Sequence, residues 1–189
     1  MHIFSQFDSS RMPSLSLKAL WRHSFLTGLK AKAIARKENQ KQIVLDDSFM
    51  GGVLHDIGKP ILSINFPDRY QRVQNEAREN NLPVWEAEKT VLGATHAEVG
   101  GYLSGLWGIP DSIVESIVFH HHPNLCPGRE FGPLVTVHVS NALDRAATSE
   151  NLRSLDRDYL ARLNFLGRLP AWEEVCRQID QEGEGNEWE

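Results

Sequence analysis

Hydrophobic residues recur every three or four positions along most of the chain, which is the period of an α-helix. The pattern predicts an all-α protein, a compact multi-helix bundle in which prolines, glycines and capping polar residues separate successive helices. The expected helices cover residues 15–37, 67–80, 83–92, 95–107, 110–120, 134–147, 156–166 and 170–179. A further helix is expected to begin at Asp46 and to stop at residues 58–60.

Several local features refine this pattern. Asp46 and Asp47 are expected to cap the second helix, and Thr95 and Glu98 have the spacing of a capping box. The valine-rich run 135–139 is typical of a strand in composition, but it lies within a longer apolar pattern and is predicted to be helical. One apolar stripe is expected along the first helix: Leu17, Leu20, Trp21, Ser24, Phe25, Gly28 and Leu29.

A chain of 189 residues has the length of one domain with a single core. We expect an N-terminal segment over 1–14, one helical domain over 15–181 and an acidic, disordered tail over 182–189. The tail is predicted to be disordered because it is acidic and interrupted by glycine.

The composition excludes several classes of function. Twenty Lys and Arg against 25 Asp and Glu give a net charge of −5, without the basic surplus typical of nucleic-acid-binding proteins. Cys126 and Cys176 are too few for a disulfide framework. No apolar stretch approaches the ~20 residues that span a bilayer, and none has the form of an export signal. The sequence therefore predicts a cytoplasmic protein that binds neither nucleic acid nor membrane.

The histidines are candidates for chemistry. Imidazole and carboxylate groups suit first-row metal ions, and such ligands can converge inside a helical bundle. Each histidine alone also has a plainer interpretation. His23 would be a hydrogen-bonded core residue, His96 part of a helix cap, and the run 120–122 a solvated helix terminus.

The order of several short segments adds a stronger signal. These are Trp21-Arg22-His23-Ser24, Gly52–Lys59 (GVLHDIGK), Pro67–Tyr70 (PDRY), Thr95–Gly100 (THAEVG), Trp107–Pro110 (WGIP) and Ile117–Pro123 (IVFHHHP). The set resembles the HD superfamily, and more closely its HDOD branch, which is related to the HD-GYP cyclic-dinucleotide phosphodiesterases. The resemblance covers roughly residues 15–147.

The resemblance implies a metal centre. In the HD superfamily a histidine, a His-Asp pair and a later aspartate bind one metal, and further histidines can hold a second. The matching positions of this chain are His23, His55, Asp56, His96, His120, His121 and, in place of the later aspartate, Asn141. Lys59 matches the family lysine beside the metals and the substrate phosphate, so Lys59 and Asp56 are the implied catalytic residues. The implied cofactor is one or two divalent or di-iron-type ions (Fe, Mn, Zn or Ni).

Three features depart from the family pattern. Asn141 offers a neutral amide, so metal affinity should fall, and Asp144 on nearly the same helix face is the alternative carboxylate. No Gly-Tyr-Pro motif follows the paired histidines, so hydrolysis of cyclic dinucleotides is not supported. HDOD modules usually carry a further helical half before the Trp-x-His segment, and a chain without it should expose apolar surface and form homo-oligomers. His138 is expected to be a core histidine.

These departures favour a bacterial signal-transduction or regulatory HDOD module that has a partly retained His/Asp metal site and interacts with a signalling protein partner. The alternative is an active metal-dependent phosphohydrolase. It would be a phosphodiesterase or phosphomonoesterase that acts on a phosphate-containing small molecule such as a nucleotide. Bound metal is expected in both cases, whereas turnover of a phosphate ester is expected only in the second.

Overall fold

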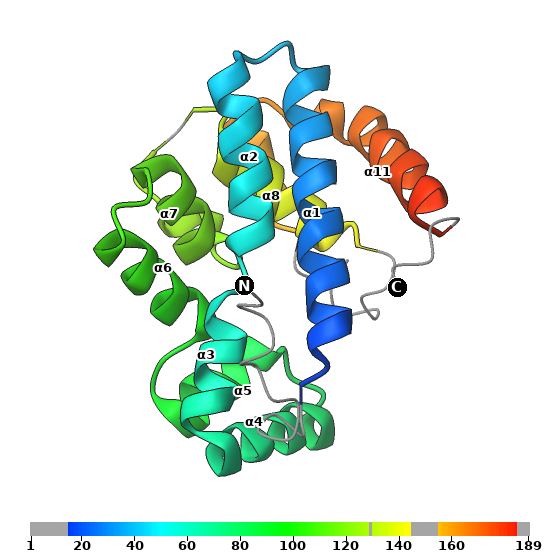
Figure 1. Cartoon of the computed structure of the whole chain (residues 1–189). Coiled ribbons are helices and arrows are strands. Elements are labelled where there is room, and N and C mark those ends of the chain that lie inside the picture. Colours follow the sequence, from blue (N-terminus) through cyan, green and yellow to red (C-terminus); the bar gives the residue numbers. More distant parts are fainter. Residues whose placement is uncertain (1–14, 129, 145–154, 185–189) are drawn as a thin grey trace, which may run out of the picture.

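The computed structural model describes residues 15–128, 130–144 and 155–184, and within these ranges it contains helices and no strand (Figure 1). The prediction of an all-α bundle is confirmed. The α-helices are α1 (Leu17–Lys37), α2 (Gln42–Leu54), α3 (Gly58–Asn65), α4 (Pro67–Asn80), α5 (Val84–Leu92), α6 (His96–Leu106), α7 (Asp111–Phe119), α8 (Pro133–Ala142), α10 (Arg157–Arg162) and α11 (Leu169–Glu184). Two short 3-10 helices, η3 (Pro123–Leu125) and η4 (Leu166–Arg168), complete the described elements.

Helix α8 forms the centre of the bundle. All of its residues from Pro133 to Ala142 are buried, and it packs against α1, α2 and α7 (Figure 1). A helix that is covered on every side can be apolar throughout. This explains why the run 135–139 looks like a strand in composition, and the prediction that it is helical is confirmed.

Helices α1 and α2 approach each other closely through two glycines. A Cβ atom on Gly52 would lie 2.5 Å from the Cα of Gly28, so larger residues at these positions would push the helices apart. His23 lies just over one turn before Gly28, and His55 follows Gly52 by three residues. The close crossing therefore brings these two histidines toward each other.

Two hydrophobic clusters stabilise the remaining helices. The larger one joins α1, α8, α10 and α11: Ile34, Cys126, Leu134, Val135, Val139, Tyr159, Leu160, Leu169, Trp172 and Cys176. The smaller one joins α4 to α5 through Val73, Ala77 and Ala87. Helices α4 and α5 pack beside α3 and α6, below α1 and α2 in Figure 1.

The predicted start of the second helix is wrong. Helix α2 begins at Gln42 and lacks a side-chain cap, so Asp46 and Asp47 lie inside it. The predicted stop at 58–60 is instead the start of α3. Pro60 does not break α3 because the first turn of a helix needs no backbone N–H at that position.

Other boundaries also differ from the predicted ones. Helix α8 ends at Ala142, and residues 145–147 lie outside the described residues. Helix α11 continues to Glu184, so the expected disordered tail begins inside a helix, while 185–189 and the segment 1–14 lie outside the described residues. The apolar stripe of α1 is only partly buried, since Trp21 remains 49% exposed. No helix in the described part of the chain has both the length and the apolar composition needed to cross a bilayer.

Candidate metal centre

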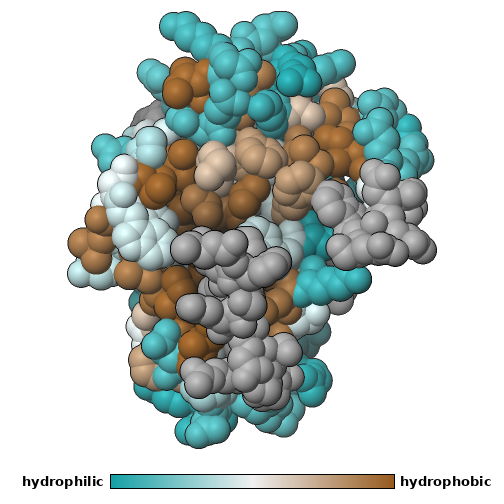
Figure 2. Space-filling model, in the orientation of Figure 1, coloured by the Kyte–Doolittle hydropathy of each residue, from teal (hydrophilic) through white to brown (hydrophobic). Residues whose placement is uncertain are grey.

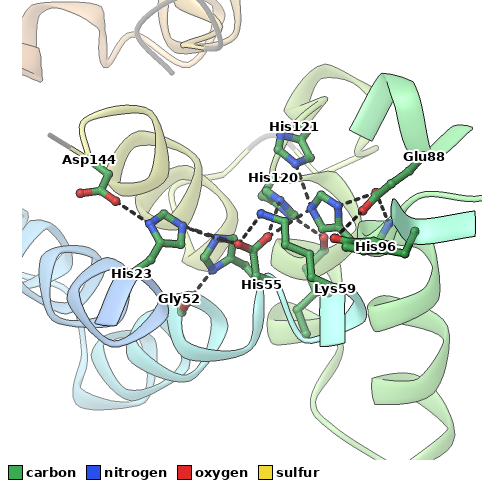
Figure 3. Close-up of polar contacts among 12 residues, drawn as sticks. His23, Gly52, His55, Lys59, Glu88, His96, His120, His121 and Asp144 are labelled. Carbon is green, nitrogen blue, oxygen red and sulfur yellow. Dashed lines mark hydrogen bonds and ion pairs between the residues drawn. The ribbon is translucent and has the colours of Figure 1, made fainter. Parts of the chain in front are cut away.

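Six of the seven predicted metal ligands meet where the ends of α2, α6 and α7 face α1 (Figure 3). They form two groups, and within each group the ligand atoms lie within 4.8 Å of one another. The first group comprises His23, His55 and Asp56, and the second comprises His96, His120 and His121.

The first group contains two imidazoles whose free nitrogens face each other. His55 Nδ1 donates to the carbonyl of Gly52 at 2.7 Å, and His23 Nδ1 donates to Asp144 Oδ2 at 2.5 Å. Because carbonyl and carboxylate oxygens only accept, both Nδ1 atoms carry hydrogens, and in the neutral form of each ring the lone pair is then on Nε2. These two Nε2 atoms lie 3.1 Å apart. Facing lone pairs repel unless a cation lies beside them, so the donor set fits a metal ion.

The second group is held in a similar way. His120 caps the C-terminal end of α7, and its Nδ1 donates to the carbonyl of Ile117 at 2.7 Å. His96 opens α6 after the predicted capping box, which is present, and its Nδ1 donates to Glu88 Oε2 at 2.6 Å. His121 Nε2 lies 3.1 Å from His96 Nε2. Within the described ranges, His120 Nε2 is buried without a hydrogen-bond partner, which is the expected state of a ligand atom without its metal.

Asp56 lies between the two groups. Its Oδ2 is 3.4 Å from His55 Nε2 and 3.6 Å from His23 Nε2. Its Oδ1 is 3.2 Å from His96 Nε2. Lys59 Nζ contacts Asp56 Oδ2 at 2.6 Å. One carboxylate therefore faces both histidine groups, and each group offers three side chains, which leaves coordination positions for water or substrate.

Burial and charge keep most of the ligands in the states that metals bind. Burial lowers the pKa of His55 to about 4, and burial together with neighbouring imidazoles lowers the pKa values of His120 and His121 well below the usual range. Burial opposes the ionisation of Asp56, but the neighbouring His55 and Lys59 hold its pKa well below the usual range. Burial also opposes protonation of His96, but Glu88 raises its pKa. Most of these imidazoles are therefore neutral at neutral pH.

We expect the metal-free protein to lose stability as the pH falls from about 6.5 toward 4. Folded His55 binds a proton only near pH 4, whereas the unfolded chain binds it near 6.5, so the unfolded state takes up more protons in this range. His55 alone should lower the free energy of unfolding by about 2 kcal/mol at about pH 5. Urea denaturation of chelator-treated protein measures this slope. The His55→Gln variant should have a shallower slope, and an unchanged slope would contradict the assignment.

Asp144, the alternative to Asn141 as the later carboxylate, contacts the first group. Asn141 lies in the last turn of α8 and is 9% exposed. Besides Asp56, the carboxylate of Asp144 reaches this group, where it contacts the outer nitrogen of His23 and so supports a ligand from behind. His138 donates to the carbonyl of His120 at 2.8 Å and accepts from the backbone N–H of Asp156. His138 is therefore a hydrogen-bonded core residue, as predicted.

Glu88 is a functional candidate that sequence analysis missed. It is fully buried and accepts hydrogen bonds from both the backbone N–H and the Nδ1 of His96 at 2.7 and 2.6 Å. The hydroxyl of Tyr70 donates to its other oxygen at 3.4 Å. The only sequence signal is a glutamate beside Ala87 on the buried side of a short helix.

Solvent reaches part of the centre. His23 and Lys59 are 19% and 22% exposed and His121 is half-buried, while His55, Asp56, His96 and His120 are almost fully buried. A cavity of about 520 Å³ extends to Asp56 between α1, α2 and the start of α3, and most of its lining is apolar: Leu17, Leu20, Trp21, Val53, Ile57 and Pro60. Figure 2 shows hydrophobic side chains across the middle of the face on which α1 and α2 lie.

A helical bundle that gathers histidines around a His-Asp pair is the arrangement that the resemblance to the HD superfamily implies. The family comparison agrees: the HDOD domain model matches residues 1–123, so the chain belongs to the HDOD domain family. The match contains both histidine groups, Asp56 and Lys59, and it ends before α8. Asn141 and Asp144 therefore lie outside it.

Solved structures share the fold. An HDOD domain protein of unknown function from Geobacter sulfurreducens has a TM-score of 0.67 at 20% identity, over 88% of this chain and 63% of that one. A Shewanella amazonensis protein, provisionally described as a phosphohydrolase, has a TM-score of 0.65 at 20% identity, over 91% of this chain and 63% of that one. A Marinobacter aquaeolei protein, provisionally described as a signal-transduction protein, has a TM-score of 0.56 at 17% identity, over 87% of this chain and 39% of that one.

One curated relative matches in sequence. An uncharacterized protein of Treponema pallidum is 29% identical over 134 residues, which are 70% of this chain and 26% of that protein. The chain thus spans about a quarter of the length of this relative and less than two thirds of each solved structure.

Proposed function

We propose that the chain is a metal-dependent phosphohydrolase module of the HDOD family. The observation that carries the proposal is that the Nε2 atoms of His23 and His55 lie 3.1 Å apart, while the Nδ1 atoms of both rings are hydrogen-bonded. The carboxylate of Asp56 lies beside this pair and also faces the second group of three histidines. The sequence favoured a regulatory module because Asn141 replaces a carboxylate and no Gly-Tyr-Pro motif follows the paired histidines. The contact between Asp144 and His23 bears on the first of these grounds, because a carboxylate does support a ligand of the first group from its outer side.

The residues divide into ligands, orienting groups and a substrate-binding cation. His23, His55 and Asp56 would hold one ion, and His96, His120 and His121 the other. A bound first-row metal supplies a water with a pKa near neutrality and polarises a phosphoryl oxygen. Asp144 and Glu88 fix the ring orientation of His23 and His96 through hydrogen bonds to Nδ1, as outer-shell carboxylates do in metalloproteins.

Lys59 is the group best placed to bind substrate. Its Nζ lies 2.6 Å from Asp56 and is partly exposed, so it can reach a phosphate that approaches from solvent. A cation at this position would stabilise negative charge that develops on the phosphoryl oxygens. We infer that the substrate is a phosphate-containing small molecule, which enters beside His23 and Lys59.

The Lys59→Met variant should retain metal and lose hydrolysis. We expect turnover of p-nitrophenyl phosphate or bis-p-nitrophenyl phosphate, measured with Mn²⁺, Fe²⁺, Zn²⁺ or Ni²⁺, to fall about 100-fold or more. The matched control is Lys89→Met, which removes a lysine that pairs with Glu98 on the exposed side of α6. Turnover in Lys59→Met that equals that of the control would contradict the role of Lys59.

A regulatory module in bacterial signalling is the second candidate. The near-complete burial of His55, His96 and His120 favours it, because metal held by these residues would tie α2, α6 and α7 together. In that role the metal would set the shape that a signalling protein partner recognises. Wild-type protein that carries metal but turns over neither ester would support this candidate against hydrolysis.

A further inference from the structure

A buried lysine connects the first histidine group to the C-terminal helix. The side chain of Lys30 is fully buried on α1. Its Nζ lies 2.6 Å from Asp180 Oδ1 of α11 and 3.5 Å from Asp144 Oδ1. A buried ammonium group is costly unless anions replace its hydration. The two carboxylates therefore hold Lys30 in place, and Lys30 in turn fixes the position of both.

Asp144 uses its two oxygens in different directions. Oδ1 faces Lys30, and Oδ2 accepts the Nδ1 hydrogen of His23 at 2.5 Å. Lys30 and His23 are seven residues apart, which is about two helical turns and places them on the same side of α1. A continuous series of contacts therefore runs from α11 through Lys30 and Asp144 to the ring of a proposed metal ligand.

We propose that Lys30 and Asp180 are positioning residues that hold Asp144 against His23 and thereby set the direction of His23 Nε2. Helix α11 thus contributes to the first histidine group, although it lies outside the residues that the family model matches. The consequence for metal affinity rests on the proposed function, but the contact between Asp144 and His23 does not. If Asp180 loses its charge, Lys30 draws Asp144 toward itself and away from His23.

The test compares two variants, each of which neutralises one carboxylate that joins α1 to the C-terminal helices. Asp180→Asn removes the partner of Lys30. The control Glu38→Gln removes a carboxylate at the end of α1 that accepts from Arg168 and from Trp172 of α11 at 2.9 and 2.8 Å. Ring-nitrogen NMR shifts of the histidines are recorded first on the metal-free full chain. A Zn²⁺ titration is then followed separately on the His23 and His96 signals.

We expect Asp180→Asn to shift the Nδ1 signal of His23 in the metal-free protein. We also expect it to weaken Zn²⁺ binding at His23 about tenfold, with binding at His96 unchanged. Glu38→Gln should change neither readout. An unmoved His23 signal in Asp180→Asn, or equal effects of the two variants, would overturn the proposal. If the wild type binds no Zn²⁺, the proposed metal function fails, while the metal-free spectra still decide the positioning role.

A double variant covers the case in which Asp180→Asn does not fold. Replacing Lys30 with Met and Asp180 with Leu removes the buried pair in favour of apolar packing, which proteins often tolerate. It should fold, yet it leaves Asp144 without its lysine, so the His23 signal should again shift. A wild-type His23 signal in this variant would overturn the proposal.

Discussion

The Asp56→Asn variant should lose metal from both histidine groups. Asp56 is the side chain that faces both groups, with Oδ2 toward His55 and Oδ1 toward His96. Its negative charge is also the counterpart of Lys59. An asparagine of the same shape leaves the lysine uncompensated beside the imidazoles, which repels a metal cation. Metal content after purification without chelator should fall to about a tenth of the wild-type value or less.

The matched control for this variant is Asp46→Asn. Asp46 lies on α2, the helix that ends just before Asp56, and pairs with Lys32 on the surface, so its replacement removes an equal charge away from the site. The control should retain wild-type metal content. Asp56→Asn protein that is folded by circular dichroism and still carries metal in both groups would show that Asp56 does not join them.

The Gly58→Ala variant should destabilise the protein and separate the two groups. Gly58 begins α3, and a Cβ atom there would lie 2.0 Å from the backbone oxygen of His96. The clash is with main chain, so relief requires movement of α3 away from α6. We expect a loss of about 3 kcal/mol in the free energy of unfolding, measured by urea denaturation. The same movement would draw Asp56 away from His96 and weaken metal binding.

Gly105→Ala provides the comparison for this glycine. Gly105 lies in α6, and a Cβ atom there would meet no described atom within 4 Å. Alanine favours helix over glycine, so this variant should gain about 0.5 to 1 kcal/mol. If Gly58→Ala were as stable as the wild type, the close contact between α3 and α6 could not be what aligns the two groups.

Much of the fold could be predicted from periodicity because most of its helices pack one apolar face inward. The ranges 67–80 and 83–92 agree with α4 and α5 to within one residue, and the capping box at Thr95 forms as its spacing predicts. Helix α3 was missed because proline and glycine at 58–60 usually end a helix. Here they occupy its first turn, where they are tolerated.

The site could be predicted only in part, because its ligands are separated by up to 98 residues between His23 and His121. The ligand positions came from the resemblance of short segments, which identifies residues that contact the metal but not those that support them. Glu88, Lys30 and Asp180 lie outside those segments. Lys30 could have been noticed from its spacing, since it lies on the buried face of α1 between Thr27 and Ile34. Its partners Asp144 and Asp180 depend on tertiary packing that periodicity does not specify.

The most direct test of the metal centre is anomalous diffraction from crystals of protein purified without chelator, recorded at the absorption edge of the metal found in it. We predict anomalous density within bonding distance of the Nε2 atoms of His23 and His55, and a second peak among His96, His120 and His121. The proposed metal centre would be contradicted by anomalous density that lies only at surface residues. It would also be contradicted if no density were found although the histidine rings keep the arrangement described.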